Sequence, residues 1–242
     1  MDMDYGIQMY SLRDTTEQDM EGSLRAVADM GYKLVEFAGF GGNPAEKVAE
    51  WLDTYGLTCH STHTGHAWVV QDLEGCVRYH KTIGCDYLIV PGFGHDTREK
   101  VEDFIAFCNE YQPRLAKEGI RLGYHNHSHE FLPTPYGMMI HEEIERRTKV
   151  DFQIDTFWAF NAGLDPLAVL DRLQDRIRCI HLKDGFKGGE GRSLGLGEAP
   201  VAAVRQKAIE LGFTMIVESE GCEPTGAEEA RRCIDYLRSL EK

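Results

Sequence analysis

Ionisable side chains stand at or just beyond the ends of short apolar segments in the second half of the chain. Short β-rich apolar runs of this kind are typical of buried strands, which rarely carry charged groups without a partner. The residues that stand there are Glu130, Asp155, His181 and Glu218. Three carboxylates and one imidazole suit a hard divalent cation, and without a cation the converging negative charges would repel each other.

We therefore expect one divalent metal ion, Mn²⁺ or Mg²⁺ first and Zn²⁺ or Co²⁺ as alternatives. Each of the four residues taken singly could instead be a hydrogen-bonded cap at a strand end. Their recurrence on consecutive strands favours the metal site.

The densest polar stretch is Tyr124–Glu130, which reads YHNHSHE. Side chains alternate between the two faces of a strand, so His125 and His127 are expected on the same face and His129 at the periphery. An imidazole titrates near neutral pH and can therefore accept or donate a proton during catalysis. We assign this role to His127, with simple orientation of a ligand as the alternative.

The remaining polar or aromatic residues near strand ends are candidates for substrate binding. Trp158 could form an apolar wall for a sugar ring or pack in the core. Arg192, inside the glycine-rich loop Gly188–Gly197, could hold a substrate oxygen or remain a surface arginine. The full set of candidates is Glu36, His63, His125, Trp158, Lys183 and Arg192.

Strand-like and amphipathic helical segments alternate along the whole chain. Strands are predicted at Gly6–Leu12, Leu34–Phe37, Thr58–His63, Tyr87–Pro91, Arg121–His127, Val150–Asp155, Arg178–Lys183 and Thr214–Ser219. Helices are predicted at Glu21–Met30, Pro44–Tyr55, Leu73–Ile83, Arg98–Lys117, Ile140–Arg147, Pro166–Asp175, Ala199–Leu211 and Gly226–Leu240. Eight alternating units in 242 residues favour a single (β/α)8 TIM barrel domain spanning 1–242. The segment after the first strand lacks the G-x-G-x-x-G turn of a dinucleotide-binding sheet.

The composition narrows the class of protein. A formal charge of −14 argues against nucleic acid as a partner, because phosphate binding relies on clustered lysine and arginine. The seven cysteines are odd in number and form no C-x-x-C pair, which disfavours disulfides and a cysteine zinc site. No signal peptide and no membrane-spanning run is recognisable. We expect a cytoplasmic protein that acts on a small molecule without a membrane, either as a homo-oligomer or with a partner subunit.

Three segments resemble the xylose-isomerase-like barrels known as sugar phosphate isomerases/epimerases. They are Gly123–Phe131 (GYHNHSHEF), Ile154–Pro166 (IDTFWAFNAGLDP) and Ile180–Asp184 (IHLKD). Members of this family hold one divalent ion through glutamate, aspartate, histidine and glutamate. Asp155, His181 and Glu218 match three of these positions. The resemblance carries the fourth to Glu130, with His125 as runner-up because a histidine stands where many relatives have the glutamate.

The resemblance implies an isomerase or epimerase of a ketose or keto-sugar. A base would remove a proton beside the carbonyl, the metal would stabilise the enediolate, and an acid would return the proton. His127 or Glu130 would face Glu218 as this pair. Relatives with a YHNH segment also include lyases and dehydratases of 3-keto-glycosides and inososes, which start with the same step. An abasic-site endonuclease shares the barrel but conflicts with the charge, and a non-catalytic sugar-binding subunit is a further alternative.

Overall fold

The computed structural model describes residues 3–241 and contains, within that range, one closed barrel of eight parallel strands. The strands are β1 (Gly6–Gln8), β2 (Leu34–Ala38), β3 (Thr58–His63), β4 (Tyr87–Val90), β5 (Arg121–His125), β6 (Asp151–Asp155), β7 (Ile177–Leu182) and β10 (Thr214–Val217). Neighbours in the chain are neighbours in the barrel, and β1 closes it by pairing with β10 as well as β2. The predicted TIM barrel is confirmed.

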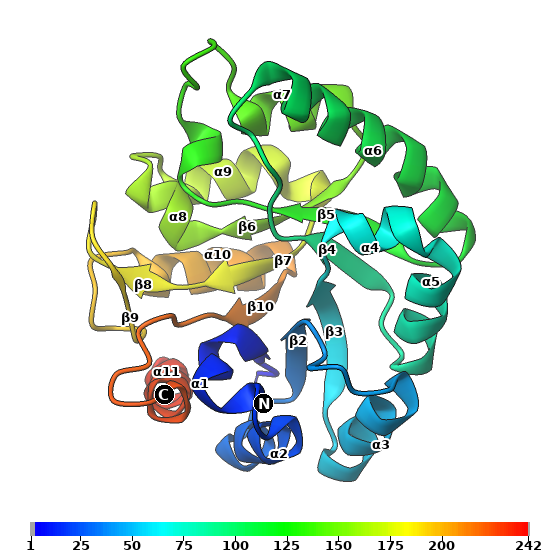
Figure 1. Ribbon diagram of the computed structural model, residues 1–242. Coiled ribbons are helices and arrows are strands. Elements are labelled where there is room, and N and C mark those ends of the chain that lie inside the picture. Colours follow the sequence, from blue (N-terminus) through cyan, green and yellow to red (C-terminus); the bar gives the residue numbers. More distant parts are fainter. Residues whose placement is uncertain (1–2, 242) are drawn as a thin grey trace.

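Amphipathic helices surround the barrel (Figure 1). They are α2 (Met20–Met30), α3 (Ala45–Tyr55), α5 (Leu73–Thr82), α6 (Arg98–Lys117), α7 (Ile140–Arg147), α9 (Pro166–Leu173), α10 (Val201–Leu211) and α11 (Gly226–Ser239). Local sequence sets their ends: the Asp19 side chain caps the first turn of α2, and Gly31 ends that helix in the left-handed conformation. The apolar helix faces and the outward faces of the strands form the main core.

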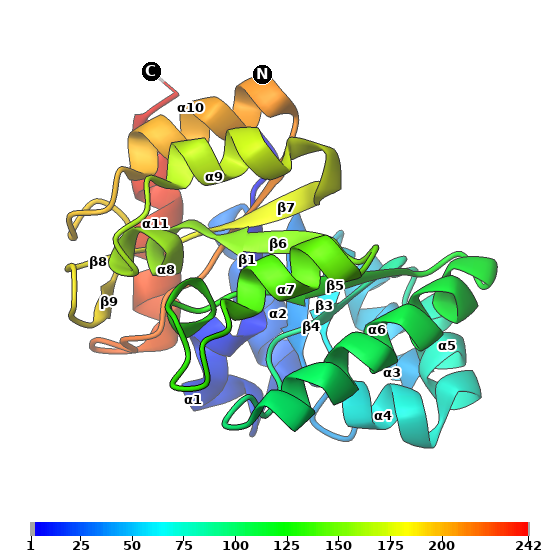
Figure 2. The same ribbon diagram turned by 90° about the horizontal axis from the view of Figure 1, so that it is seen from above.

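The last helix closes the ring against the first segments of the chain. Helix α11 contacts α2 and the short helix η1 (Met9–Leu12), and both views show α11 beside the first helical segments of the chain (Figure 2). Arg238 donates a hydrogen bond to the carbonyl of Met3 at 2.9 Å. No helix within residues 3–241 has the length and apolarity that crossing a bilayer requires.

The predicted elements differ from the observed ones mainly at the carboxyl ends of the strands. The first strand was predicted to reach Leu12, but it stops at Gln8, and Met9–Leu12 forms a 3-10 helix. Strand β5 ends at His125 and not at His127. Short helices that the sequence analysis missed follow β1, β3 and β6: α1 (Arg13–Thr16), α4 (His66–Gln71) and α8 (Thr156–Asn161). They belong to the loops over the barrel mouth, where local apolar periodicity is too short to be read.

Two β-bulges adjust which residues face the barrel interior. One lies where β2 pairs with β3 and the other where β6 pairs with β7. Each bulge adds one residue to a strand, His60 in β3 and Arg178 in β7. The extra residue shifts by one position which side chains beyond the bulge face the barrel interior. Ser61 and His181 consequently point into the barrel.

Inside the barrel an apolar floor supports the polar residues above it. Tyr87, Ile89, Cys179 and Ile216 form a separate buried cluster. Gly123 on β5 leaves room for the Tyr87 ring, since a Cβ at this position would lie 2.6 Å from the tyrosine hydroxyl. This floor closes the lower half of the barrel and confines polar groups to the half near the carboxyl ends of the strands.

Candidate active site

Four buried side chains meet at the carboxyl ends of β5, β6, β7 and β10. The possible ligand atoms of His125, Asp155, His181 and Glu218 all lie within 4.8 Å of one another. His181 Nδ1 is 3.2 Å from Glu218 Oε2 and 3.7 Å from Asp155 Oδ2. Three of these residues were predicted as metal ligands, and the structure brings them together.

The fourth predicted ligand, Glu130, lies elsewhere. It belongs to a separate cluster with His127 and His129, and the position expected for it beside Asp155 is taken by His125. The chain turns away after β5, and the short helix η2 (His129–Phe131) directs Glu130 toward the outward-facing Tyr124. His125, by contrast, is the last residue of β5, and its side chain lies on the inward face of the barrel with those of the other strand-end residues. The structure therefore corrects the grouping of Glu130 with Asp155, His181 and Glu218.

Asp155 carries the clearest sign that the cluster suits a cation. One carboxylate oxygen, Oδ1, caps helix α8 by accepting a hydrogen bond from the Trp158 amide at 2.9 Å. The other, Oδ2, is buried, and no residue in the range 3–241 donates a hydrogen bond to it. A buried carboxylate oxygen without a donor is costly, and a cation facing Oδ2 would remove that cost. The donor set and this free oxygen fit a divalent metal ion.

A buried hydrogen-bond network fixes the histidines of the cluster. Glu36 Oε1 accepts from His181 Nε2 at 2.6 Å, so Nδ1 of that ring faces Asp155 and Glu218. Burial alone would lower the pKa of His181, but Glu218 and Glu36 raise it well above its usual value. Gln153 donates to Glu36 at 2.6 Å, so its Oε1 accepts from His125 Nδ1 at 3.1 Å and leaves His125 Nε2 free. A carboxylate or amide behind a histidine is the usual way in which proteins orient a metal-binding imidazole.

Glu36 is the centre of this network and not a wall of the cavity. The side chain is fully buried and also accepts from Gln8 Nε2 at 2.7 Å and from the Ser61 hydroxyl. Burial alone would raise the pKa of Glu36, but the neighbouring His63 and His181 lower it to about 2. Glu36, predicted as a substrate-binding residue, thus lies beneath the cavity with both oxygens engaged by buried partners, and it is not among the residues that line the cavity.

Charges near the cluster keep its groups in distinct protonation states. Burial, together with His181 and His63, holds the pKa of His125 well below its usual value, so this ring is neutral. Burial opposes ionisation of Glu218, yet Lys183 and His181 hold the pKa of Glu218 well below its usual value. Lys183 is itself buried, with Nζ 3.1 Å from Glu218 Oε2 and 3.9 Å from Asp155 Oδ2. It also pairs with Glu220, and it therefore restrains the carboxylates instead of lining the cavity.

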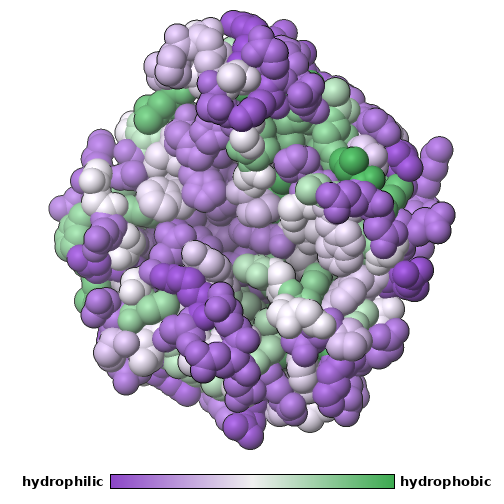
Figure 3. Space-filling view, in the orientation of Figure 1, coloured by the Kyte–Doolittle hydropathy of each residue, from purple (hydrophilic) through white to green (hydrophobic). Residues whose placement is uncertain are grey.

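A cavity of about 450 Å³ opens above the cluster. Among the residues that line it are His63, His125, His127 and Glu218, which come from the ends of β3, β5 and β10. In Figure 3, hydrophilic residues gather around a hollow near the middle of the face, inside the ring of helices. The cavity is large enough for a small polyol, and both His127 and Glu218 line it.

His127 is the most exposed of the three histidines that line the cavity. Its side chain is 38% exposed, while Nδ1 is enclosed and receives no hydrogen bond from any residue between 3 and 241. Burial lowers the pKa of His127, but Glu130, whose Oε1 lies 3.8 Å from Nδ1, raises it above the ordinary value overall. Glu130 is anchored by the Tyr124 hydroxyl at 2.7 Å and the His127 amide at 2.8 Å. Of the two residues predicted to act opposite Glu218, His127 lines the cavity together with Glu218, whereas Glu130 lies behind His127 and does not line it.

A second cavity of about 790 Å³ adjoins the first and shares Glu220 with it. The predicted residues Trp158 and Arg192 line this second cavity. Trp158 also lies under Lys183, with Nζ 4.5 Å from the ring centroid. Arg192 pairs with Glu190 at 3.2 Å, on the two-stranded sheet of β8 (Asp184–Gly185) and β9 (Gly191–Arg192). Both residues therefore stand beside the site and not over the metal-binding cluster.

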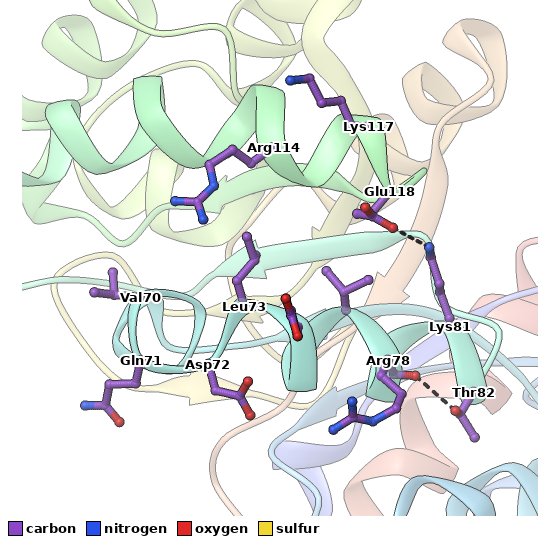
Figure 4. Close-up of a pocket in the computed structure, with 12 residues that line it drawn as sticks. Val70, Gln71, Asp72, Leu73, Arg78, Lys81, Thr82, Arg114, Lys117 and Glu118 are labelled. Carbon is purple, nitrogen blue, oxygen red and sulfur yellow. Dashed lines mark hydrogen bonds and ion pairs between the residues drawn. The ribbon is translucent and has the colours of Figure 1, made fainter.

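A larger hollow of about 1060 Å³ lies on the outer surface between α4, α5 and α6 (Figure 4). Its lining consists mainly of long charged side chains, and Lys81 pairs with Glu118 across it at 2.6 Å. It contains none of the strand-end residues. Size alone thus does not mark the site, whereas the convergence of buried ionisable groups does.

Sequence reasoning missed Ser61 and Gln153. Gln153 precedes Asp155 by two residues on the same strand, so alternation already placed it on the inward face. Its polar side chain in a fully buried strand was the available signal. The hydrogen bonds to Glu36, which is more than one hundred residues away, could not be read from the sequence.

A sequence model of the xylose isomerase-like TIM barrel family matches residues 24–240. The chain belongs to this family. No curated protein matches the sequence significantly.

Solved structures with the same fold are similar at low sequence identity. A protein described as a sugar phosphate isomerase/epimerase from Parabacteroides distasonis ATCC 8503 is 24% identical with a TM-score of 0.85, covering 98% of both chains. The IOLI protein with a bound zinc atom is 14% identical with a TM-score of 0.77, covering 98% of both chains. An L-ribulose 3-epimerase is 16% identical with a TM-score of 0.77, covering 98% of this chain and 94% of its own.

Proposed function

We propose that the protein is a divalent-metal-dependent isomerase or epimerase of a ketose or keto-sugar. The observation that carries the proposal is the buried group of His125, Asp155, His181 and Glu218, with a free Asp155 oxygen, at the bottom of a cavity lined by His127. The family and the sugar isomerases and epimerases of the same fold support it.

The residues that would hold the ion are His125, Asp155, His181 and Glu218, so that His125 replaces Glu130 in the predicted ligand set. Two imidazoles and two carboxylates suit Mn²⁺, Co²⁺ or Zn²⁺ better than Mg²⁺, which prefers oxygen ligands. When bound, the ion would polarise the carbonyl group beside the carbon that loses its proton.

Glu218 and His127 are the two groups in the proposed proton transfer. Glu218 is held ionised by Lys183 and His181, so its carboxylate can accept the carbon-bound proton. Burial lowers the pKa of His127, but Glu130 raises it above the ordinary value overall, which favours the protonated imidazole whose Nε2–H can return the proton. Two titratable groups with pKa values pushed apart are the usual arrangement for paired base and acid.

Glu130 acts in this scheme through His127. Its carboxylate faces Nδ1 and accepts a hydrogen bond from the His127 amide, so it orients the ring and keeps Nε2 toward the cavity. We therefore propose Glu130 as a positioning residue for the acid. Lys183 similarly positions Glu218 and neutralises part of the charge of Asp155 and Glu220.

The second cavity favours one other candidate function, a lyase that starts with the same proton abstraction. A space of about 790 Å³ beside the site would accommodate a leaving group attached to the sugar. Its charged lining comprises Glu190, Glu220, Glu223, Glu229, Arg192 and Arg232, and this excess of carboxylates disfavours a phosphate there. An uncharged leaving group, such as the second half of a glycoside, fits this lining better.

Deuterium exchange tests the step that both functions share. The Mn²⁺-loaded protein is incubated in D₂O with a panel of ketoses, inososes and 3-keto-glycosides, and NMR follows the hydrogen beside the carbonyl. Exchange on at least one compound is expected, and an isomerase should give an isomer that differs in mass from the starting sugar only by the deuterium taken up. A product that has lost its leaving group would identify the lyase instead, and absence of exchange on every compound would contradict both.

Matched variants test whether the residues of the site carry out the reaction and bind the metal ion. His127→Asn should lose formation of the isomer while binding Mn²⁺ with unchanged affinity, whereas His95→Asn, a nearby imidazole outside the cavity lining, should retain it. Asp155→Asn should weaken Mn²⁺ binding by more than about 100-fold. Asp151→Asn, at the other end of the same strand and paired with Arg121, should leave Mn²⁺ affinity unchanged.

A further inference from the structure

A second cluster of ligand-type side chains lies beside the proposed catalytic group. The possible ligand atoms of His127, His129 and Glu130 lie within 4.8 Å of one another. Glu130 Oε1 is 3.2 Å from His129 Nε2 and 3.8 Å from His127 Nδ1. All three residues belong to one turn of chain just after β5, so their relative positions are set locally.

The cluster contains an enclosed nitrogen without a partner. His127 Nδ1 is buried, and within residues 3–241 no group forms a hydrogen bond with it. An imidazole nitrogen that faces a carboxylate without a hydrogen bond is poorly satisfied as it stands. A cation between Nδ1 and Oε1 would use the nitrogen lone pair and the carboxylate charge together.

Neighbouring residues hold the cluster in a fixed arrangement. Glu130 is fully buried, with its two oxygens anchored by the Tyr124 hydroxyl and the His127 amide. The His129 ring stacks on His95 with centroids 4.1 Å apart. His129 is also 45% exposed, so an ion has a path from solvent to the cluster.

The donor chemistry selects the kind of ion. Two imidazoles and one carboxylate are ligands that Zn²⁺ prefers, while Mg²⁺ and Ca²⁺ favour sites made of oxygen atoms. A tetrahedral Zn²⁺ with bonds of about 2.0–2.1 Å holds its ligand atoms about 3.3 Å apart. The separations from Glu130 Oε1 are close to this spacing, and small rotations of two exposed or half-exposed rings would complete it.

We propose that His127, His129 and Glu130 form a second, zinc-selective site, distinct from the cluster of His125, Asp155, His181 and Glu218. A zinc ion bonded to Nδ1 of His127 replaces the carboxylate of Glu130 as the group that orients this ring in the first cavity. On the basis of the proposed function, the site is therefore inhibitory: it takes the acid out of the reaction without displacing the ion of the first cluster.

Zinc stoichiometry tests the site without any assay of turnover. Metal-free protein is equilibrated with buffered micromolar Zn²⁺, and bound metal is measured by mass spectrometry of the digested protein. Wild type should bind two ions per chain, Asp155→Asn one, His129→Asn one, and the double variant none. His95→Asn, which changes the stacked neighbour but no ligand, should still bind two. Circular dichroism confirms that each variant is folded.

Failure of the second zinc site and failure of the proposed enzymatic function would give different results. A wild-type ion that the folded His129→Asn variant still binds, with none lost relative to wild type, would overturn the second site, whether wild type binds one ion or two. In the Mn²⁺-loaded enzyme, the fraction of activity that added Zn²⁺ removes should be large for wild type and His95→Asn and small for His129→Asn, each relative to its own activity. If no substrate is found, the stoichiometry still decides the site. Two bound ions with equal Zn²⁺ inhibition of wild type and His129→Asn would overturn the inhibitory role.

Discussion

The carboxylate of Glu36 should determine both the stability of the barrel interior and the affinity of the metal-binding cluster. Its two oxygens accept hydrogen bonds from Gln8, Ser61, Gln153 and His181, all of them buried. In Glu36→Gln, one oxygen becomes an amide nitrogen that faces donors whichever way the amide points. At least one donor must then turn away or lose its partner.

The size of the effect follows from the ionisation of Glu36. Its pKa falls from 4.5 to about 2 in the folded protein, and each pKa unit corresponds to about 1.36 kcal/mol. The ionised side chain therefore contributes about 3 kcal/mol near neutral pH. This contribution is present above pH 4.5 and is lost as the pH falls toward 2, because the folded-state pKa is the lower one. Loss of an orienting carboxylate behind a metal-binding histidine should also weaken metal affinity by about 10- to 100-fold.

Two measurements on the same variant check these values. Urea unfolding of the metal-free protein at pH 7 should show Glu36→Gln less stable than wild type by about 3 kcal/mol. Calorimetric titration with Mn²⁺ should show the loss of affinity. Glu50→Gln removes an exposed carboxylate paired with Lys47 and should change stability by less than about 1 kcal/mol. A Glu36→Gln protein that resembles this control in both measurements would refute the reasoning.

Three further perturbations test other parts of the structure. Because Glu130 raises the pKa of His127, the pH at which kcat/KM depends on this group should move to lower values in Glu130→Gln, and an unmoved profile would argue against the pairing. Burial lowers the pKa of His141 to about 3, against 6.5 in the unfolded chain, so the free energy of unfolding should fall as the pH drops below 6.5. Urea unfolding between pH 6.5 and 4.5 should show wild type losing about 2–3 kcal/mol more of its free energy of unfolding than His141→Leu. Equal losses in the two proteins would contradict this. Gly123→Ala places a Cβ against the Tyr87 hydroxyl and should destabilise the fold by about 1–3 kcal/mol in thermal or urea unfolding, while a neutral result would show that the Tyr87 ring can move aside.

Much of the site was predictable because strand ends in a parallel barrel meet at one rim. Asp155 and His181 were read as inward-facing groups at the ends of buried strands, and Glu218 follows directly after the last strand. Alternation along a strand needs no long-range information. The barrel followed from the same regularity, since alternating strands and helices leave few compact arrangements.

The loop residues after β5 could not be placed in this way. His125 is the last residue of the strand and inherits its inward direction from the pleat. Glu130 lies five residues further, beyond the regular structure, and its direction depends on the turn through η2 and on the hydrogen bond from Tyr124. The resemblance to the family favours the carboxylate of Glu130 beside Asp155, but the path of the backbone after β5 places the imidazole of His125 at that position instead.

The sequence by itself determined the barrel, its single repeated unit and the strand-end positions of Asp155, His181 and Glu218, because these follow from local periodicity. The tertiary structure alone decided that Glu36 and Gln153 orient the histidines from below, that His125 completes the cluster, and that Glu130 faces His127 outside it. These contacts join residues from different strands, so they depend on how the whole barrel closes. The periodicity of the sequence predicts which way a side chain points, whereas barrel closure determines which other side chains it contacts.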